Sequence, residues 1–205
     1  TGILFEVKRF IYRRDFRKAI DSLSWFKHRF SRSKNLENAS YWLAYCRYKL
    51  SEDMVDEKEK KKIDIEAIKD LDELIEHFPA GEWADDAKIL RIEFAQKLVR
   101  LGEGKYKKYI IDALRPVKKT ESDIEIAALA ALITIDKKTA IARLIDIIKK
   151  EKDSEVRKKA IFILATNKIE VAIPVIQKAA EKDHDESVRS AAALWLNYLK
   201  TTIRR

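Results

Sequence analysis

The sequence has few of the residues that form turns, disulfides and metal sites. Its 205 residues include only 4 Gly, 3 Pro and 1 Cys. Because Gly and Pro provide most tight turns, their scarcity disfavours a fold built from β-hairpins. A single Cys excludes an internal disulfide and a cluster of thiolate metal ligands, although it leaves the redox compartment open. No apolar run approaches the roughly 18 residues of a membrane-spanning helix.

The residues that are abundant favour helices. Apolar residues make up 46% of the chain and charged residues 38%, a balance that is typical neither of disorder nor of a membrane protein. Ala, Leu, Ile, Lys and Glu dominate the sequence. These side chains lose little conformational freedom in a helix. The composition therefore predicts an all-α protein with a sizeable core.

The C-terminal part of the chain repeats at an offset of 32 residues. Ala128, Ala160 and Ala192 occupy the same position in the three copies, and a large aliphatic residue stands on either side of each. A second matching segment follows the first two copies, so each unit is predicted to be a pair of helices. The copies are ESDIEIAALAAL (121–132), DSEVRKKAIFIL (153–164) and DESVRSAAALWL (185–196).

This repeat resembles HEAT repeats. The run D-x-E-V-R-x-x-A-x-x-x-L at 153–164 is their usual signature, and Arg157 and Arg189 both match it. The first copy departs from the pattern, because Glu125 stands at the position of the Arg. The small Ala lets adjacent helices approach closely, as a stack of helix pairs requires. The resemblance implies two HEAT-like pairs and a half over about 121–200.

The N-terminal part repeats at an offset of 48 residues. FRKAIDSLSWFKHRF (16–30) and IEAIKDLDELIEHF (65–78) share apolar positions at this spacing, for example Leu23 and Leu71. The charged run SEDMVDEKEKKKID at 51–64 accounts for the unusual length of the offset. We expect this run to be a solvated loop or an extension of a helix, and a contact arm is the functional alternative.

Further motifs connect the N-terminal repeat with a family. Y-W-L-A-Y at 41–45, Phe78-Pro79 at the end of one unit and A-D-D-A at 84–87 resemble tetratricopeptide (TPR) repeats. They are most similar to the TPR repeats of bacterial periplasmic proteins of outer-membrane assembly and the Tol-Pal system. The resemblance implies a concave groove lined by the first helix of each pair, and a periplasmic or cell-envelope location.

The segment LRPVKKT at 114–120 divides the two repeats, because Pro116 disfavours helical backbone at Arg115. We predict TPR-like repeats in 1–115 and HEAT-like repeats in 116–205. Together they would form an all-α, right-handed α-solenoid of helix-turn-helix repeats. The expected helices lie near 3–14, 16–30, 36–50, 64–78, 82–101, 105–115, 122–134, 139–150, 154–166, 170–182 and 186–200.

The decamer YWLAYCRYKL at 41–50 combines four aromatic side chains with the only Cys. On a helix, Cys46 lies on the face that points into the stack, so we predict a small core residue and no reactive thiol. The TPR resemblance makes a neighbouring face, formed by Tyr41, Tyr45 and Tyr48, the candidate groove for a peptide. The alternative is that these rings pack on adjacent helices.

A basic cluster lies near the N-terminus. Residues 1–50 contain twelve Lys and Arg against four Asp and Glu. Such an excess neutralises nucleic-acid phosphates, attracts anionic lipid headgroups or docks an acidic protein, and an ordinary solvated face is the alternative. The candidate electrostatic contacts have helical spacing: Arg9, Arg13, Arg14, Arg17 and Lys18.

The sequence shows no motif for catalysis, metal binding or a cofactor. It has no Gly-rich phosphate loop and no G-x-S-x-G motif. His28, His77 and His184 are far apart in sequence, so no metal site is predicted. Asp85 and Asp86 begin a predicted helix, where negative charge is favourable. We therefore predict a non-enzymatic protein without metal or cofactor.

The predicted function is a scaffold or adaptor for protein–protein interaction. The alternative is a helical-repeat protein that binds nucleic acid through its basic N-terminal end. Trp195 and Leu199 lie on a last predicted helix without a second one after it, so we expect an exposed end. Acidic protein partners and self-association through this end both stay open. Because the sequence opens on Thr1, we expect a processed or truncated N-terminus, and the cytoplasm stays open beside the periplasm.

Overall fold

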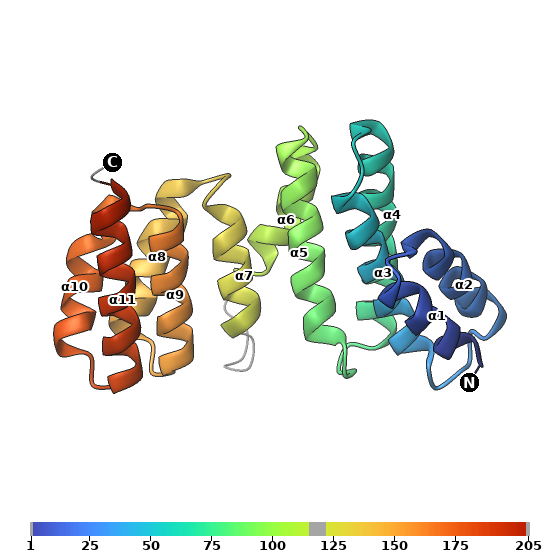
Figure 1. Ribbon diagram of the computed structural model, residues 1–205, viewed down its shortest axis with the longest axis horizontal. Helices are drawn as coiled ribbons and strands as arrows, with labels where there is room; N and C mark the ends of the chain where they lie inside the picture. The colour runs from blue at the N-terminus through green and yellow to red at the C-terminus, as the bar shows by residue number, and fades with distance from the viewer. Residues whose placement is uncertain (1, 115–121, 204–205) are drawn as a thin grey trace. The chain divides into compact units, whose positions relative to one another are not determined.

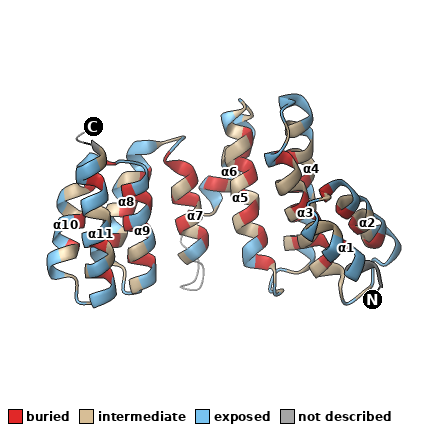
Figure 2. Cartoon of the chain, viewed as in Figure 1, coloured by how far each residue is buried: buried red, intermediate tan, exposed pale blue. Residues whose placement is uncertain are grey.

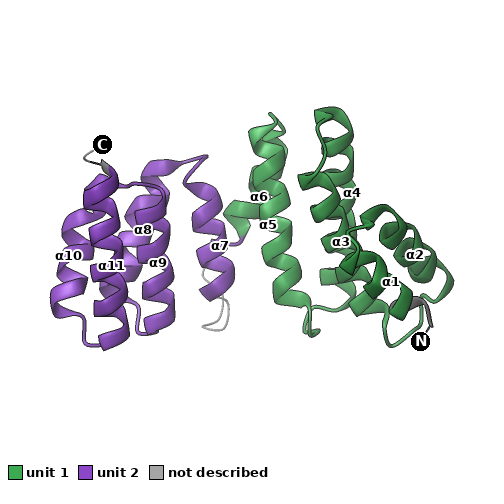
Figure 3. Ribbon diagram, in the orientation of Figure 1, with its two compact units in different colours: residues 1–112 green, residues 113–205 purple. Residues whose placement is uncertain are grey.

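The computed structural model describes residues 2–114 and 122–203, and every regular element in these two ranges is a helix. The chain forms two compact units, residues 1–112 and 113–205 (Figure 3). The all-α fold class is thereby confirmed. The assignment of TPR-like and HEAT-like domains to 1–115 and 116–205 stays a prediction. Pro116, on which the predicted boundary rests, lies outside the described residues.

In the first unit, each helix packs on the next one along the chain (Figure 1). This sequential pairing is the arrangement expected of an α-solenoid, in which each element buries its apolar face against its neighbours. The helix that was expected at 105–115 is shorter: a 3₁₀ turn at Gly104–Tyr106 comes first, and the α-helix that follows it ends at Asp112. The helices are α1 (Gly2–Tyr12), α2 (Phe16–Arg29), α3 (Leu36–Glu52), α4 (Glu57–His77), α5 (Ala84–Arg100) and α6 (Lys107–Asp112).

In the second unit, helices also contact the next but one in the chain. Helix α9 packs on both α7 and α11, and α10 packs on α8. Corresponding helices of successive repeats therefore stack on one another, as the offset of 32 residues predicts. The helices are α7 (Ser122–Leu132), α8 (Lys137–Lys150), α9 (Ser154–Thr166), α10 (Ile173–Lys182) and α11 (Glu186–Ile203).

Buried residues run along the helices (Figure 2), and most of the repeated apolar positions are among them. The alanines that share a position in the C-terminal repeat, Ala128, Ala160 and Ala192, are fully buried. The same holds for the pair Leu23 and Leu71 of the N-terminal repeat. A spacing of three and four residues puts these side chains on one face of each helix, which is why the sequence pattern locates the core.

Aspartates begin several of the helices. Asp56 accepts a hydrogen bond from the Glu59 amide at 2.8 Å, and Asp153 accepts one from the Glu155 amide at 2.8 Å. Each bond satisfies a backbone N–H that has no partner inside the helix. The cap at Asp56 starts α4 earlier than predicted. The charged run 51–64 is therefore mostly helix, and only residues 53–56 of it lie between α3 and α4.

Arg157 ties together two loops of the second unit, and only 2% of the residue is exposed. Its Nε and Nη2 donate to the carboxylate of Asp183 at 3.0 and 2.7 Å. Its Nη1 donates to the carbonyl oxygens of Glu151 and Lys152 at 2.9 and 2.8 Å. Burial alone would raise the pKa of Asp183, but hydrogen bonds from Arg157 and the Asp185 amide hold that pKa below 3.8.

The Arg of the HEAT signature has the same local role in the next repeat. Arg189 donates to the carbonyl oxygen of Asp183 at 2.7 Å, six residues earlier, as Arg157 does to that of Glu151. At the corresponding position of the first copy, Glu125 instead pairs with Arg143 of α8 at 3.2 Å. The departure from the signature thus replaces one polar contact with another.

A buried polar cluster lies between α3, α4 and α5. Asp64 is 0% exposed, and neither of its carboxylate oxygens accepts a hydrogen bond within the described residues. Burial raises the pKa of Asp64 above 3.8, and the nearby Ser51 hydroxyl and Lys97 ammonium offset this only in part. Burial likewise lowers the pKa of Lys97. The charged run was expected to be a solvated loop or an extension of a helix; most of it is a helix extension, and Asp64 near its end is buried rather than solvated.

We predict that Arg157→Leu destabilises the second unit by about 3–5 kcal/mol, because Asp183 would keep a buried charge without a cation. The matched change Arg189→Leu removes a half-buried side chain and should cost about 1–2 kcal/mol. Hydrogen exchange read by mass spectrometry, with urea denaturation, measures both. Equal losses of stability for the two variants would show that the ion pair between Arg157 and Asp183 adds no more stability than the single hydrogen bond of Arg189.

We predict that Asp64→Asn raises the free energy of unfolding more at about pH 7 than at about pH 4. A raised carboxyl pKa means that the folded state binds a proton more readily than the unfolded chain. Ionised Asp64 therefore destabilises the folded state at neutral pH, and the penalty fades as the pH falls through its folded-state pKa. Urea denaturation at both pH values measures the difference. Glu76→Gln, an exposed acid on the same helix, is the control, and an equal effect of Asp64→Asn at both pH values would contradict the prediction.

Candidate functional site

The first three helices enclose an apolar hollow of about 350 Å³. Val7 and Leu23 are buried at its base, whereas Tyr12 is 92% exposed. Such a volume, lined mainly by hydrocarbon, suits an apolar side chain of a ligand better than water. We call this hollow the α1–α3 groove, and its lining residues are Val7, Lys8, Ile11, Tyr12, Leu23, Asn38 and Trp42.

Trp42 is the aromatic wall of the α1–α3 groove, and neighbouring rings hold it in place. It meets Tyr45 edge to face at 5.2 Å between ring centroids and Trp83 at 6.0 Å. Trp83 is fixed in turn, because its backbone N–H donates to the side chain of Glu37 at 2.8 Å. The loop before α5 thus supports the ring that α3 presents to the groove.

The three predicted groove tyrosines lie beside Trp42 but are not among the lining residues of the groove. All three are half-buried and make ring contacts within the first unit. Tyr41 stacks on Trp83 at 4.4 Å, and burial raises the pKa of Tyr41 to about 12. Tyr48 packs edge to face on Phe94 at 5.6 Å, and burial raises its pKa as well. Contact of Tyr41, Tyr45 and Tyr48 with a partner stays a prediction.

Lys97 contributes to the environment of Tyr48. Its Nζ lies 3.7 Å from the centroid of the Tyr48 ring, which is a cation–π geometry. The same nitrogen is buried and has no hydrogen-bond partner within the described residues. Tyr48 therefore packs on α5, a contact that sequence reasoning missed because Phe94 and Lys97 are distant from Tyr48 in the chain.

Cys46 is a core residue. It is fully buried and packs in the cluster formed by α1, α2 and α3. Burial raises the pKa of its thiol to about 12. Because the thiolate is the reactive form, this thiol is unreactive in the folded protein at neutral pH.

The predicted basic cluster is exposed on α1, α2 and the loop between them. Arg14 forms an ion pair with Asp53 at 3.3 Å, and Lys18 forms one with Asp15 at 2.8 Å. The remaining three arginines make no ion pair within the described residues, which leaves their charges available at the surface. They are Arg9, Arg13 and Arg17.

A second hollow of about 590 Å³ opens between α2, α3 and α4. Its charged groups already bind one another: Lys27 pairs with Asp70 at 2.8 Å and with Glu73 at 2.7 Å, and Arg47 also pairs with Asp70. These ion pairs connect three helices. A ligand would have to replace them, so this hollow is a weaker candidate than the α1–α3 groove.

The predicted exposed end at α11 needs a correction. Leu199 is 0% exposed, because α11 packs on both α9 and α10 and covers this face of the helix. Trp195 is half-buried and meets Phe162 edge to face at 5.1 Å. The exposed apolar side chains of α11 are instead Leu194 and Tyr198. The expected end surface therefore consists of other residues than those predicted.

No group of three or more His, Cys, Asp or Glu that could hold a metal ion occurs in residues 2–114 and 122–203. In the same residues, no helix combines the length and apolar character needed to cross a membrane.

Comparison with known families finds a match that covers almost all of the first unit. Residues 7–113, more than half of the chain, match the family YfiO, described as outer membrane lipoprotein. The chain belongs to the YfiO family. Residues 141–202 match HEAT repeats. The predicted order, TPR-like repeats followed by HEAT repeats, is thereby confirmed. No curated protein matches the chain.

The YfiO match includes every residue that lines the α1–α3 groove. TPR-like and HEAT repeats are typical of protein-interaction scaffolds. The groove and the basic cluster therefore both lie in the part of the chain for which a family is known.

We predict that the Cys46 thiol of the native chain reacts with a thiol reagent about a hundredfold or more slowly than in the urea-unfolded chain, because it is buried and protonated. Ser31→Cys, at an exposed position, is the control and should react at similar rates in both states. Rapid, complete labelling of Cys46 in the native chain would show that this part of the core opens.

Proposed function

We propose that this YfiO-family chain is a non-enzymatic scaffold that binds a protein partner in the α1–α3 groove. The observation that carries the proposal is the apolar hollow walled by Trp42, about 350 Å³ in volume, within the family-matched unit. This volume accommodates one large apolar side chain of a partner segment. The family match supports a bacterial cell-envelope setting for the interaction.

The chemistry of the groove supports binding over catalysis. Lys8 and Asn38 are the strongly polar side chains that line it, and the other lining side chains are aliphatic or aromatic. Within the described residues, neither is paired with a His or a carboxylate in the way that general acid–base chemistry requires. A groove of this kind discriminates by shape and by a few polar contacts.

The charge around the groove supports an acidic partner. Lys8 lines the groove, the exposed charge of Arg9 follows on the same helix, and that of Arg13 lies in the turn directly after it. Opposite charges speed association and align a partner, even where each exposed pair adds little affinity. The proposed ligand is therefore a segment with an apolar anchor residue flanked by Asp or Glu.

We predict that a photo-crosslinking amino acid at Tyr12 forms a discrete adduct with a partner protein in cells. Tyr12 is 92% exposed and lines the groove, so its substitution should not disturb the fold. The same amino acid at Val55, 95% exposed between α3 and α4, is the control and should form no such adduct. Trp42→Ala should reduce the Tyr12 adduct severalfold.

Two outcomes would count against the proposed function. One is an equal pattern of adducts from Tyr12 and Val55. The other is an adduct with DNA or RNA, accompanied by affinity that falls steeply with salt concentration, which would favour the nucleic-acid alternative. Circular dichroism of the Trp42→Ala variant separates loss of binding from loss of fold.

A further inference from the structure

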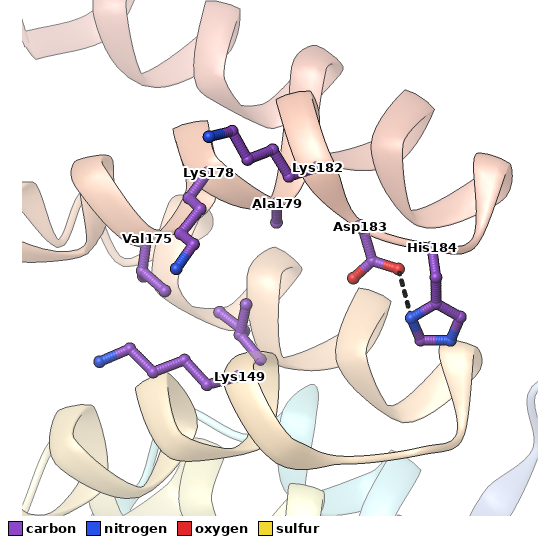
Figure 4. A pocket seen from close by; sticks show the side chains of 8 residues that line it. Lys149, Val175, Lys178, Ala179, Lys182, Asp183 and His184 are labelled. Atoms are coloured by element: carbon purple, nitrogen blue, oxygen red, sulfur yellow. Dashed lines mark ion pairs between the residues drawn. The ribbon is translucent and has the colours of Figure 1, made fainter.

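A pocket of about 370 Å³ in the second unit lies between α8 and α10 (Figure 4). Its base is apolar, because Ile148 and Ala179 are buried there and Val175 is half-buried. The charged and polar side chains around it are mostly basic. We call it the α8–α10 pocket, and its other lining residues are Lys149, Lys178, Lys182, Asp183 and His184.

Three ammonium groups surround the α8–α10 pocket without an internal partner. Lys149 comes from α8, and Lys178 and Lys182 come from successive turns of α10. All three are exposed, and none makes an ion pair or a side-chain hydrogen bond within residues 2–114 and 122–203. Like charges four residues apart on a helix repel one another. An anion in the pocket would relieve this repulsion.

The single carboxylate of the pocket does not neutralise these lysines. Asp183 accepts two hydrogen bonds from Arg157, at 3.0 and 2.7 Å, and its side chain is largely buried. The His184 ring lies next to it, with 3.6 Å between Nδ1 and Oδ1 (Figure 4). The charge of Asp183 is thus balanced by Arg157, and the pocket keeps the net positive charge of its three lysines.

We infer that the α8–α10 pocket is a second docking site, which binds an acidic segment of a protein partner. Lysine ammonium groups are mobile point charges, and here they are spaced over two turns of α10 and the facing end of α8. This spacing complements several carboxylates distributed along a segment. The apolar base complements the hydrocarbon part of Glu side chains or a neighbouring aliphatic residue.

The chemistry favours a peptide over a compact anion such as phosphate. Bidentate Arg side chains and helix N-termini are the pre-organised phosphate binders of proteins. The cations that line this pocket are lysines, and Arg157, which binds the lining residue Asp183, already donates to that carboxylate and to two carbonyl oxygens. The site is independent of the proposed function, because it lies in the other unit and shares no residue with the α1–α3 groove.

The test uses the full chain and a synthetic peptide with Glu residues on both sides of one Leu; a peptide with Gln in place of Glu is its control. We expect the Glu peptide to bind and to protect α8 and α10 from hydrogen exchange. Lys178→Gln with Lys182→Gln should weaken that binding about fivefold to tenfold. Lys150→Gln with Lys158→Gln removes the same charge from lysines that already pair with Asp146 and Glu155, and should change it less than about twofold.

Several outcomes would overturn the inference. Equal weakening by the two double variants would mean that only net charge matters. Binding of inorganic phosphate or of vesicles with anionic lipid, without binding of the Glu peptide, would assign the pocket to a phosphate group. Protection confined to α1 and α3 would place the peptide in the groove of the first unit. One further result would contradict the proposed function and leave this inference standing: Trp42→Ala does not reduce the Tyr12 adduct in cells, while the Glu peptide still binds the α8–α10 pocket.

Discussion

Helix pairs in this protein are held together by small and large apolar side chains that alternate on one face of each helix. Ala19, Ala67 and Ala160 are fully buried, and a buried Leu lies one helical turn after each. The methyl group of Ala lets two backbones approach, and the Leu fills the space beside it. Because each helix meets only its near neighbours in the chain, this local contact has to recur for the stack to continue. Every surface feature of the two units depends on that recurrence.

The polar groups inside the stack have two different consequences. Arg157 donates hydrogen bonds to the Asp183 carboxylate and to the carbonyl oxygens of Glu151 and Lys152. These bonds hold two loops in one arrangement around the buried side chain. Asp64 is buried without an accepted hydrogen bond within the described residues, and this burial raises the pKa of its carboxyl. The first group rigidifies the HEAT repeats, whereas the second puts a pH-dependent penalty into the TPR-like unit. The two units therefore differ in how polar side chains affect their stability.

The two candidate binding surfaces lie in different units: three consecutive helices line the α1–α3 groove, whereas the α8–α10 pocket lies between two helices that are not consecutive. The α1–α3 groove is apolar with a basic surrounding, and the α8–α10 pocket has an apolar base with lysines around it. A scaffold with one apolar and one electrostatic site in separate units would engage two segments of a partner, and linked binding of this kind raises avidity without new contacts.

The sequence alone determined the helices, their apolar faces and the two repeat families. Apolar spacing, the Ala positions and the motif around Arg157 are local properties. They can be recognised in a short stretch of the sequence. Only the tertiary structure decided which side chains face a hollow. Trp42 lines the groove while the neighbouring Tyr41 stacks on Trp83, and Leu199 is covered by α9 and α10. The burial of Asp64 beside Lys97 was likewise decided by the tertiary structure. The position of Asp64 on its helix does not show which distant helix covers that position.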